Sequence, residues 1–237
     1  MQLRVVPLVL ALVAATSNAA DDIGAGPAAC TDWGQRGPLV YQDDFSGPLK
    51  GYAAEYAVKP GNVIENRDGR LLMDVDSGAT VWLDKPLSGN LLISYTRRVV
   101  ADGGKNDRLS DFNHFWMARD PHRPSLFTRS GKLEEYDDLE LYYVGFGGNT
   151  NSTTRFRRYG GGERVLLAEF KDKAHLLEPN RDYAIEIAVY KGCTRMRVDG
   201  QEWFAYRDPR PLTSGYVGFR TTWSRQTIDD LKIYQLK

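Results

Sequence analysis

Residues 214–236 read SGYVGFRTTWSRQTIDDLKIYQL. Apolar and polar residues alternate along 215–223 and again along 228–236, the period-2 pattern of strands that bury one face. We therefore expect two strands here, each with an inner and an outer face.

The same kind of segment recurs along most of the chain. Short runs rich in β-forming residues lie between turn signals at 39–45, 70–83, 90–100, 112–118, 139–146, 154–159, 163–170, 182–190 and 194–206. Asp199-Gly200 suits a two-residue hairpin turn, which needs positive φ. The best helical candidate, residues 170–178, is about two turns long. The pattern predicts an all-β fold, a single antiparallel β-sandwich over residues 39–237.

Composition excludes some partners. Lysine plus arginine and aspartate plus glutamate number 31 each, so bulk charge predicts neither a nucleic-acid nor a membrane partner. Hydrophobic residues make up 42% of the chain, which is enough for an ordinary globular core.

The N-terminus has the features of a targeting segment. Arg4 precedes VVPLVLALVAA (residues 5–15), an apolar run too short to span a bilayer. Small residues at Ser17 and Ala19 predict cleavage after Ala19. We expect a signal peptide at 1–19, an extended segment at 20–38, and export to the periplasm or the extracellular space.

Two cysteines remain after this cleavage, Cys30 and Cys193. In an oxidising compartment such a pair readily forms a disulfide, which predicts a Cα–Cα separation of roughly 4.4–6.8 Å. Two free thiols are the alternative.

Several motifs carry a resemblance to known proteins. LVYQDDFSG (residues 39–47) together with residues 214–236 resembles the concanavalin A-like jelly roll of lectins, glucanases and polysaccharide lyases. DFNHFWMARDP (111–121), YYVGFGGNTNSTTRFRRY (142–159), HLLEPNRDY (175–183) and LTSGYVGFRTTWSR (212–225) resemble an uncharacterised family of secreted bacterial domains. Members often occur near pectin-degrading enzymes, and related proteins are rhamnogalacturonan-lyase-like. The resemblance implies a bacterial polysaccharide lyase acting by β-elimination on a uronate-containing glycan.

The arginine-rich segment 154–159 suits such a ligand. In an extended chain Arg155, Arg157 and Tyr159 share one face. Guanidinium groups bind carboxylates in a bidentate manner, so Arg155 and Arg157 are candidate substrate-binding residues. Asn149, in the neighbouring glycine-rich loop, is another. A salt-bridged outer face is the alternative.

Lyases on this fold use Tyr or His as base and acid, with Arg or Asn neutralising the substrate carboxylate. Residues 112–117 are apolar on both faces, which predicts a central strand that holds Asn113 and His114 in buried positions. Tyr142 and Tyr143 point to opposite faces, so at most one faces the groove. The resulting catalytic candidates are Tyr143, Asn113 and His114.

Two other functions remain open. A non-catalytic carbohydrate-binding module would stack sugar rings on Trp116 and Trp223, with Arg225 as a further contact. A retaining hydrolase would use Glu135 and Glu140 of an E-x-D-x-x-E pattern, brought together by a bulged strand about 5–5.5 Å apart.

The expected partner is an acidic polysaccharide, bound by a monomer that requires no cofactor. Asp44 and Asp229 lie in aspartate pairs on the two terminal strands, where oxygen ligands could hold a structural Ca²⁺.

Overall fold

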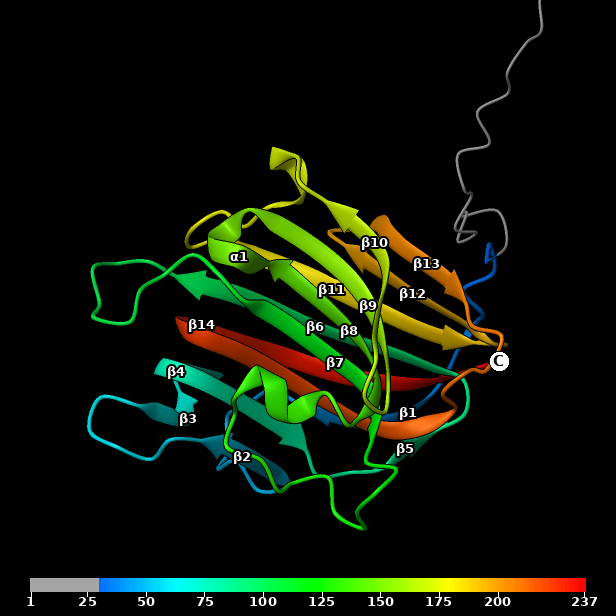
Figure 1. Cartoon of the computed structure of the whole chain (residues 1–237), viewed down its shortest axis with the longest axis horizontal. Helices are drawn as coiled ribbons and strands as arrows, with labels where there is room; N and C mark the ends of the chain where they lie inside the picture. The colour runs from blue at the N-terminus through cyan, green and yellow to red at the C-terminus, as the bar shows by residue number, and fades with distance from the viewer. Residues whose placement is uncertain (1–29) are drawn as a thin grey trace, which may run out of the picture.

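The computed structural model describes residues 30–237, which form an antiparallel β-sandwich (Figure 1). The strands are β1 (Arg36–Asp43), β2 (Tyr52–Tyr56), β3 (Val63–Arg67), β4 (Arg70–Leu83), β5 (Leu87–Ser88), β6 (Leu91–Val100), β7 (Phe112–Arg119), β8 (Glu140–Gly147), β9 (Thr153–Gly160), β10 (Arg164–Phe170), β11 (Asp182–Tyr190), β12 (Cys193–Val198), β13 (Gln201–Arg207) and β14 (Ser214–Leu236). Short helical turns are η2 (Leu133–Tyr136), α1 (Gly148–Asn151) and η3 (Lys173–His175). The expected signal peptide lies outside the described residues. Within residues 30–237, no helix has the length and apolar character of a membrane span.

The strands form two layers that share β14. The front layer in Figure 1 contains β10, β9, β8, β7 and the first half of β14. The back layer contains the second half of β14, then β6, β11, β12 and β13. β4 pairs with β14 through both halves and carries β2 and β3 on its other side, and β1 pairs with the end of β14.

The two strands expected in residues 214–236 are one strand of 23 residues with two irregular positions. Trp223 and Asp230 have positive φ, and the pairing register shifts at both. Bulges of this kind bend and twist a strand, which lets β14 pass from the front layer into the back layer. The two terminal strands of the domain, β1 and the end of β14, lie side by side, since Asp43 is opposite Leu231.

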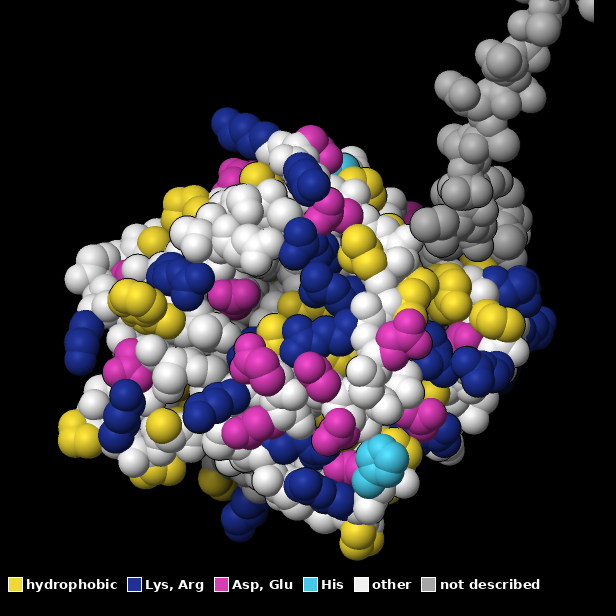
Figure 2. Space-filling view, in the orientation of Figure 1, with side chains coloured by type: hydrophobic (Ala, Val, Ile, Leu, Met, Phe, Trp, Pro, Cys, Tyr) yellow, Lys and Arg dark blue, Asp and Glu magenta, His cyan; other side chains and the backbone are white. Residues whose placement is uncertain are grey.

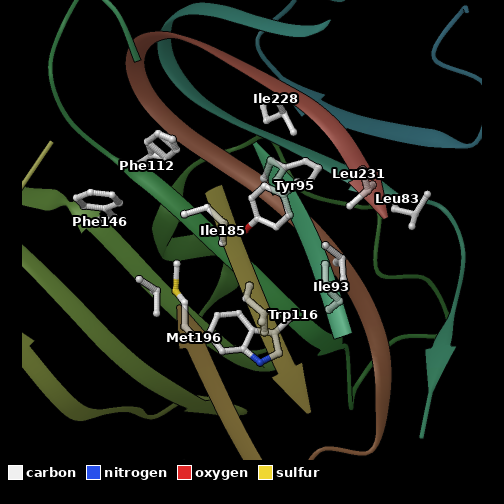
Figure 3. Close-up of a cluster of buried hydrophobic side chains, with 14 of the residues drawn as sticks. Leu83, Ile93, Tyr95, Phe112, Trp116, Phe146, Ile185, Met196, Ile228 and Leu231 are labelled. Atoms are coloured by element: carbon white, nitrogen blue, oxygen red, sulfur yellow. The ribbon is translucent and has the colours of Figure 1, made fainter. Parts of the chain in front are cut away.

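The core lies between the layers, where alternate residues of facing strands meet. Figure 3 shows Phe112, Trp116 and Phe146 of the front layer packed toward Ile93 and Met196 of the back layer. All five side chains are at most 1% exposed. This core between two layers confirms the all-β sandwich predicted from the alternating pattern.

The N-terminal segment is fastened to the back layer. Cys30 and Cys193 form the expected disulfide, with Cα atoms 5.9 Å apart. The ring of Trp33 stacks on the guanidinium of Arg197 at 3.7 Å, and its Nε1 donates to Glu202 Oε2. β1 begins at Arg36, within the segment 20–38 that the sequence analysis placed before the domain.

Two of the polar side chains buried in the interior are ionisable, His114 and Arg97. His114 is 1% exposed, and its Nδ1 is hydrogen-bonded to Tyr95 Oη. Burial, and secondly the nearby Arg97 cation, hold the pKa of His114 well below its usual value. Arg97 is fully buried and donates to Asn113 O at 2.6 Å and to Arg220 O at 2.8 Å.

We predict that the free energy of unfolding falls as the pH drops below about 6.5, because the unfolded chain protonates His114 there whereas the folded protein keeps it neutral. The contribution of this residue should approach about 1.4 kcal/mol per pH unit, the slope for one proton. Urea unfolding from about pH 7.5 to about pH 5 measures the slope. His114→Gln cannot titrate and should flatten it, and equal slopes in both proteins would contradict a buried neutral His114.

Candidate functional site

The outer face of the front layer, which points away from the core, collects most of the residues proposed from the sequence. The cross-strand partners Phe219, His114, Val144 and Phe156 face the core, so their chain neighbours point outward. Two rows of side chains then cross the outer face. The polar row is Thr80, Arg220, Asn113, Gly145, Arg155 and Glu169, and the aromatic row is Trp82, Gly218, Phe115, Tyr143, Arg157 and Leu166.

Tyr143 and Asn113 are in direct contact on this face. Tyr143 Oη donates to Asn113 Oδ1 at 3.0 Å. The phenol lies over Gly145, where a Cβ would sit 2.3 Å from Oη. Because Gly145 has no side chain, it leaves room in the polar row for the phenol of Tyr143 to reach Asn113. Tyr142 points inward, as the alternation predicts, and its Oη donates to Asp208 Oδ2 at 2.7 Å.

The two arginines proposed on β9 differ in their surroundings. Arg155 forms an ion pair with Glu169 on the neighbouring strand β10. The half-buried Arg157 has its guanidinium 5.7 Å from the centre of the Tyr143 ring, and no carboxylate in residues 30–237 pairs with it. An arginine that already pairs with a carboxylate attracts an acidic ligand only weakly. Arg157 is therefore a stronger candidate than Arg155 for binding such a ligand.

Arg220 belongs to the same cluster, although the sequence argument did not single it out. It is 2% exposed, and its Nη2 donates to Gly131 O at 3.1 Å. Its Nε and Nη1 have no hydrogen-bond partner among the described residues, and neither do Asn113 Nδ2 and Tyr159 Oη. The alternation in GYVGFRTTW could have assigned Arg220 to the face of the strand that points away from the core, since its neighbour Phe219 faces the core. Alternation could not have shown that Arg220 is buried there.

Arg220 is buried because residues 120–139, which we call the covering loop, lie over this part of the sheet (Figure 1). Glu55 on β2 fastens the loop. It accepts hydrogen bonds from Trp82 Nε1 at 2.7 Å, from Tyr136 Oη at 2.8 Å and from Arg129 N at 2.6 Å. Figure 2 shows basic side chains gathered along the middle of this face beside a hollow, with acidic side chains below them.

Burial sets the charge state of the two tyrosines. Desolvation raises the pKa of Tyr143, and the nearby cations Arg220 and Arg157 oppose this shift only in part. Desolvation likewise raises the pKa of Tyr159, whose ring centre lies 5.6 Å from that of Tyr143. Both phenols are therefore protonated at neutral pH.

His114 and Trp116 do not lie on this face, contrary to their proposed roles. Both point into the core, because residues of β7 that share the parity of Phe112 face inward. Trp116 is 0% exposed and its Nε1 donates to Thr194 Oγ1, so it cannot stack on a sugar ring. Because β7 has apolar residues on both faces, its sequence does not indicate which face points into the core.

Three further candidates lie outside the cluster. Asn149 is exposed in α1, where its Nδ2 donates to Thr153 Oγ1 at 3.3 Å. Trp223 is 51% exposed at the β14 bulge, with the Arg108 guanidinium 5.7 Å from its ring. Arg225 donates to Asp107 Oδ2 at 3.0 Å.

The hydrolase geometry is contradicted. Glu135 lies in η2 of the covering loop and accepts hydrogen bonds from Ser130 N and Oγ, whereas Glu140 begins β8 and pairs with Arg119. Glu140 lines a cavity of about 430 Å³ at the end of the sandwich, and Glu135 lines a different one. The E-x-D-x-x-E pattern therefore does not occupy one bulged strand.

The calcium site remains a prediction. Asp44 Oδ1 accepts from Ser46 N at 2.9 Å, and Asp229 Oδ2 lies 3.8 Å from Arg70 Nε. No group of three His, Cys, Asp or Glu side chains suited to a metal occurs in the described part of the chain.

Gly145→Ala tests the contact between Tyr143 and Asn113. The added Cβ should push the phenol away and lower the free energy of unfolding by about 1–3 kcal/mol, as overpacking does. In a Tyr143→Phe background the hydroxyl is gone, so the same change should cost less. Urea unfolding of the four proteins measures the coupling, and strict additivity would contradict the contact.

Comparisons with known proteins place this fold. A Bacillus subtilis protein of unknown function with a galectin-like fold superposes with a TM-score of 0.70 at 18% identity, over 85% of this chain and 98% of that chain. The carbohydrate-binding module CBM66 from Bacillus subtilis gives 0.55 at 9% identity, over 78% and 96%. The endo-β-1,3-glucanase from Pyrococcus furiosus gives 0.60 at 9% identity, over 84% and 94%. These identities show a shared fold alone.

No curated protein matches the sequence significantly. A family model described as a domain of unknown function, DUF6250, matches residues 73–231, which is more than half of the chain. This chain therefore belongs to the DUF6250 family.

Proposed function

We propose that this protein is carbohydrate-active and that the outer face of the front layer binds a glycan carrying uronate carboxylates. The observation that carries the proposal is Arg157, a half-buried cation stacked on Tyr143 with no carboxylate partner in residues 30–237. The guanidinium lies within cation–π range of the Tyr143 ring, 5.7 Å from its centre, and its bidentate donors are not used by a carboxylate of the described chain. A uronate carboxylate fits this arrangement in charge and in shape.

The fold supports a saccharide ligand. A carbohydrate-binding module and a glucanase share it, so the fold is compatible both with binding and with catalysis. Binding without reaction fits the geometry best, because Tyr143 is only 4% exposed and protonated at neutral pH.

β-Elimination is the second candidate, favoured by the adjacent phenols of Tyr143 and Tyr159. Tyr143, as phenolate, would take the proton α to the carboxylate. The electron pair would form the new C=C bond and break the bond to the glycosidic oxygen, which would receive a proton from Tyr159. Because burial raises the pKa of Tyr143, this activity would increase toward alkaline pH.

Binding and elimination can be separated in one set of assays. Affinity electrophoresis in polygalacturonate, alginate, glucuronan and neutral galactan reports retention, and ultraviolet absorbance reports an unsaturated uronate product. The proposal expects retention by at least one acidic glycan and weaker retention by galactan. Product absorbance would identify the lyase, and equal mobility in every gel without product would overturn the proposal.

Arg157→Ala should weaken binding of the retained acidic glycan about ten- to a hundredfold, the effect of losing a charge-assisted hydrogen bond of about 1.5–3 kcal/mol. Arg157→Lys should not restore the affinity, since an ammonium cannot replace a bidentate fork. Isothermal titration calorimetry measures the affinities, and thermal unfolding should hardly change.

Arg98→Ala is the matched control, because Arg98 is a partly exposed arginine of the back layer that pairs with Asp182. A similar loss of affinity in this variant would show a nonspecific charge effect and contradict the role of Arg157.

A further inference from the structure

Arg220 is a buried cation without a counter-ion. Its only hydrogen bond in the described part of the chain goes from Nη2 to the carbonyl of Gly131. Glu55, a buried carboxylate two strands away on the same face, already accepts three hydrogen bonds from other groups. The Nε and Nη1 donors of Arg220 therefore remain unused although they are out of contact with water.

Asn113 adds another donor at the same place. It lies directly opposite Arg220 in the pairing of β7 with β14, so the two Cβ atoms are about 4.5–5.5 Å apart. Because Tyr143 Oη donates to Asn113 Oδ1, the amide nitrogen is left as the unpaired group, and it is fully buried. The Arg220–Asn113 pair thus offers unpaired N–H donors, and its one acceptor atom, Asn113 Oδ1, already accepts from Tyr143.

A second buried cation lies behind this pair. On the inner side of the same strands, Arg97 donates to the main-chain oxygens of Asn113 and Arg220. It holds both backbones in place and adds positive charge without pairing with a carboxylate in residues 30–237. Buried charges of one sign are unfavourable unless an opposite charge joins them.

We propose that Arg220 and Asn113 form an enclosed binding position for a carboxylate, which supplies the acceptors and the negative charge that the fold lacks. The proposal rests on the function proposed above, and it assigns to the uronate a second contact, beneath the covering loop. A ligand reaches this position when the segment around Gly131 moves off the sheet, because Arg220 is 2% exposed with the loop in place.

Asn113→Asp is the most direct test, because the aspartate has nearly the same shape and places a carboxylate beside Arg220. The free variant should have a higher Tm than the wild type, since the buried cation gains a partner. It should bind trigalacturonate at least about tenfold more weakly, because the position is already filled. A lower Tm with unchanged affinity would overturn the proposal.

Arg220→Met removes the cation and keeps an unbranched side chain. Its Tm should equal or exceed that of the free wild type, since replacing a buried charge by an apolar residue is often stabilising. The rise in Tm that trigalacturonate causes should be clearly smaller in this variant than in the wild type, because only the contact with Arg157 is left. Neutral galactotriose should raise the Tm of neither protein. A lower Tm together with a full response to trigalacturonate would show that Arg220 is structural.

The two proposals fail in different ways. One outcome refutes only the Arg220–Asn113 position. In it, acidic glycans bind the wild type and Arg157→Ala weakens this binding, but Asn113→Asp and Arg220→Met bind the glycans as tightly as the wild type does. If no acidic glycan binds the wild type, the proposed function fails. The Tm of Asn113→Asp still reports whether Arg220 lacks an anion, and an unchanged or lower value refutes that as well.

Discussion

The guanidinium of Arg97 joins β6, β7 and β14 near the place where β14 leaves the front layer for the back layer. Its hydrogen bonds reach Asn113 O, Arg220 O and Gln226 Oε1. Burial lowers the pKa of Arg97 to about 9, so it is still charged at neutral pH. The outer face depends on this contact, because the two residues whose carbonyls it holds carry the unpaired donors on the other side of the sheet.

Some polar groups of the front layer have partners within the described part of the protein, and others do not. Gly145 admits the phenol of Tyr143, Glu169 neutralises Arg155, and Glu55 fastens the covering loop. Arg157 and Arg220 are left without anions although each lies next to satisfied neighbours. Folds that leave buried or half-buried charge unpaired at one place lose stability there, and such places are commonly functional. The carboxylate ligand proposed above would supply the anions that Arg157 and Arg220 lack.

Strand periodicity predicted much of this picture from the sequence. It assigned Arg155, Arg157 and Tyr159 to one face of β9 and separated Tyr142 from Tyr143, and the structure agrees on both. It could not tell that Glu169 would neutralise one arginine, because that depends on the register between β9 and β10. It also could not reveal that Arg220 is buried, since the covering loop reaches it from about ninety residues earlier in the chain. Trp116 was misplaced because β7 is apolar on both sides and alternation does not say which side is the core.

The most direct measurement is a titration of the arginine Nε–H signals by NMR with trigalacturonate, and with the same trisaccharide after its carboxyl groups have been reduced to alcohols. Our account predicts that the signals of Arg157 and Arg220 shift with the acidic ligand only, while that of Arg98 on the back layer stays in place. Shifts confined to Arg119, Arg158 and Arg210, which line the cavity at the end of the sandwich, would instead show that the outer face is not the binding site.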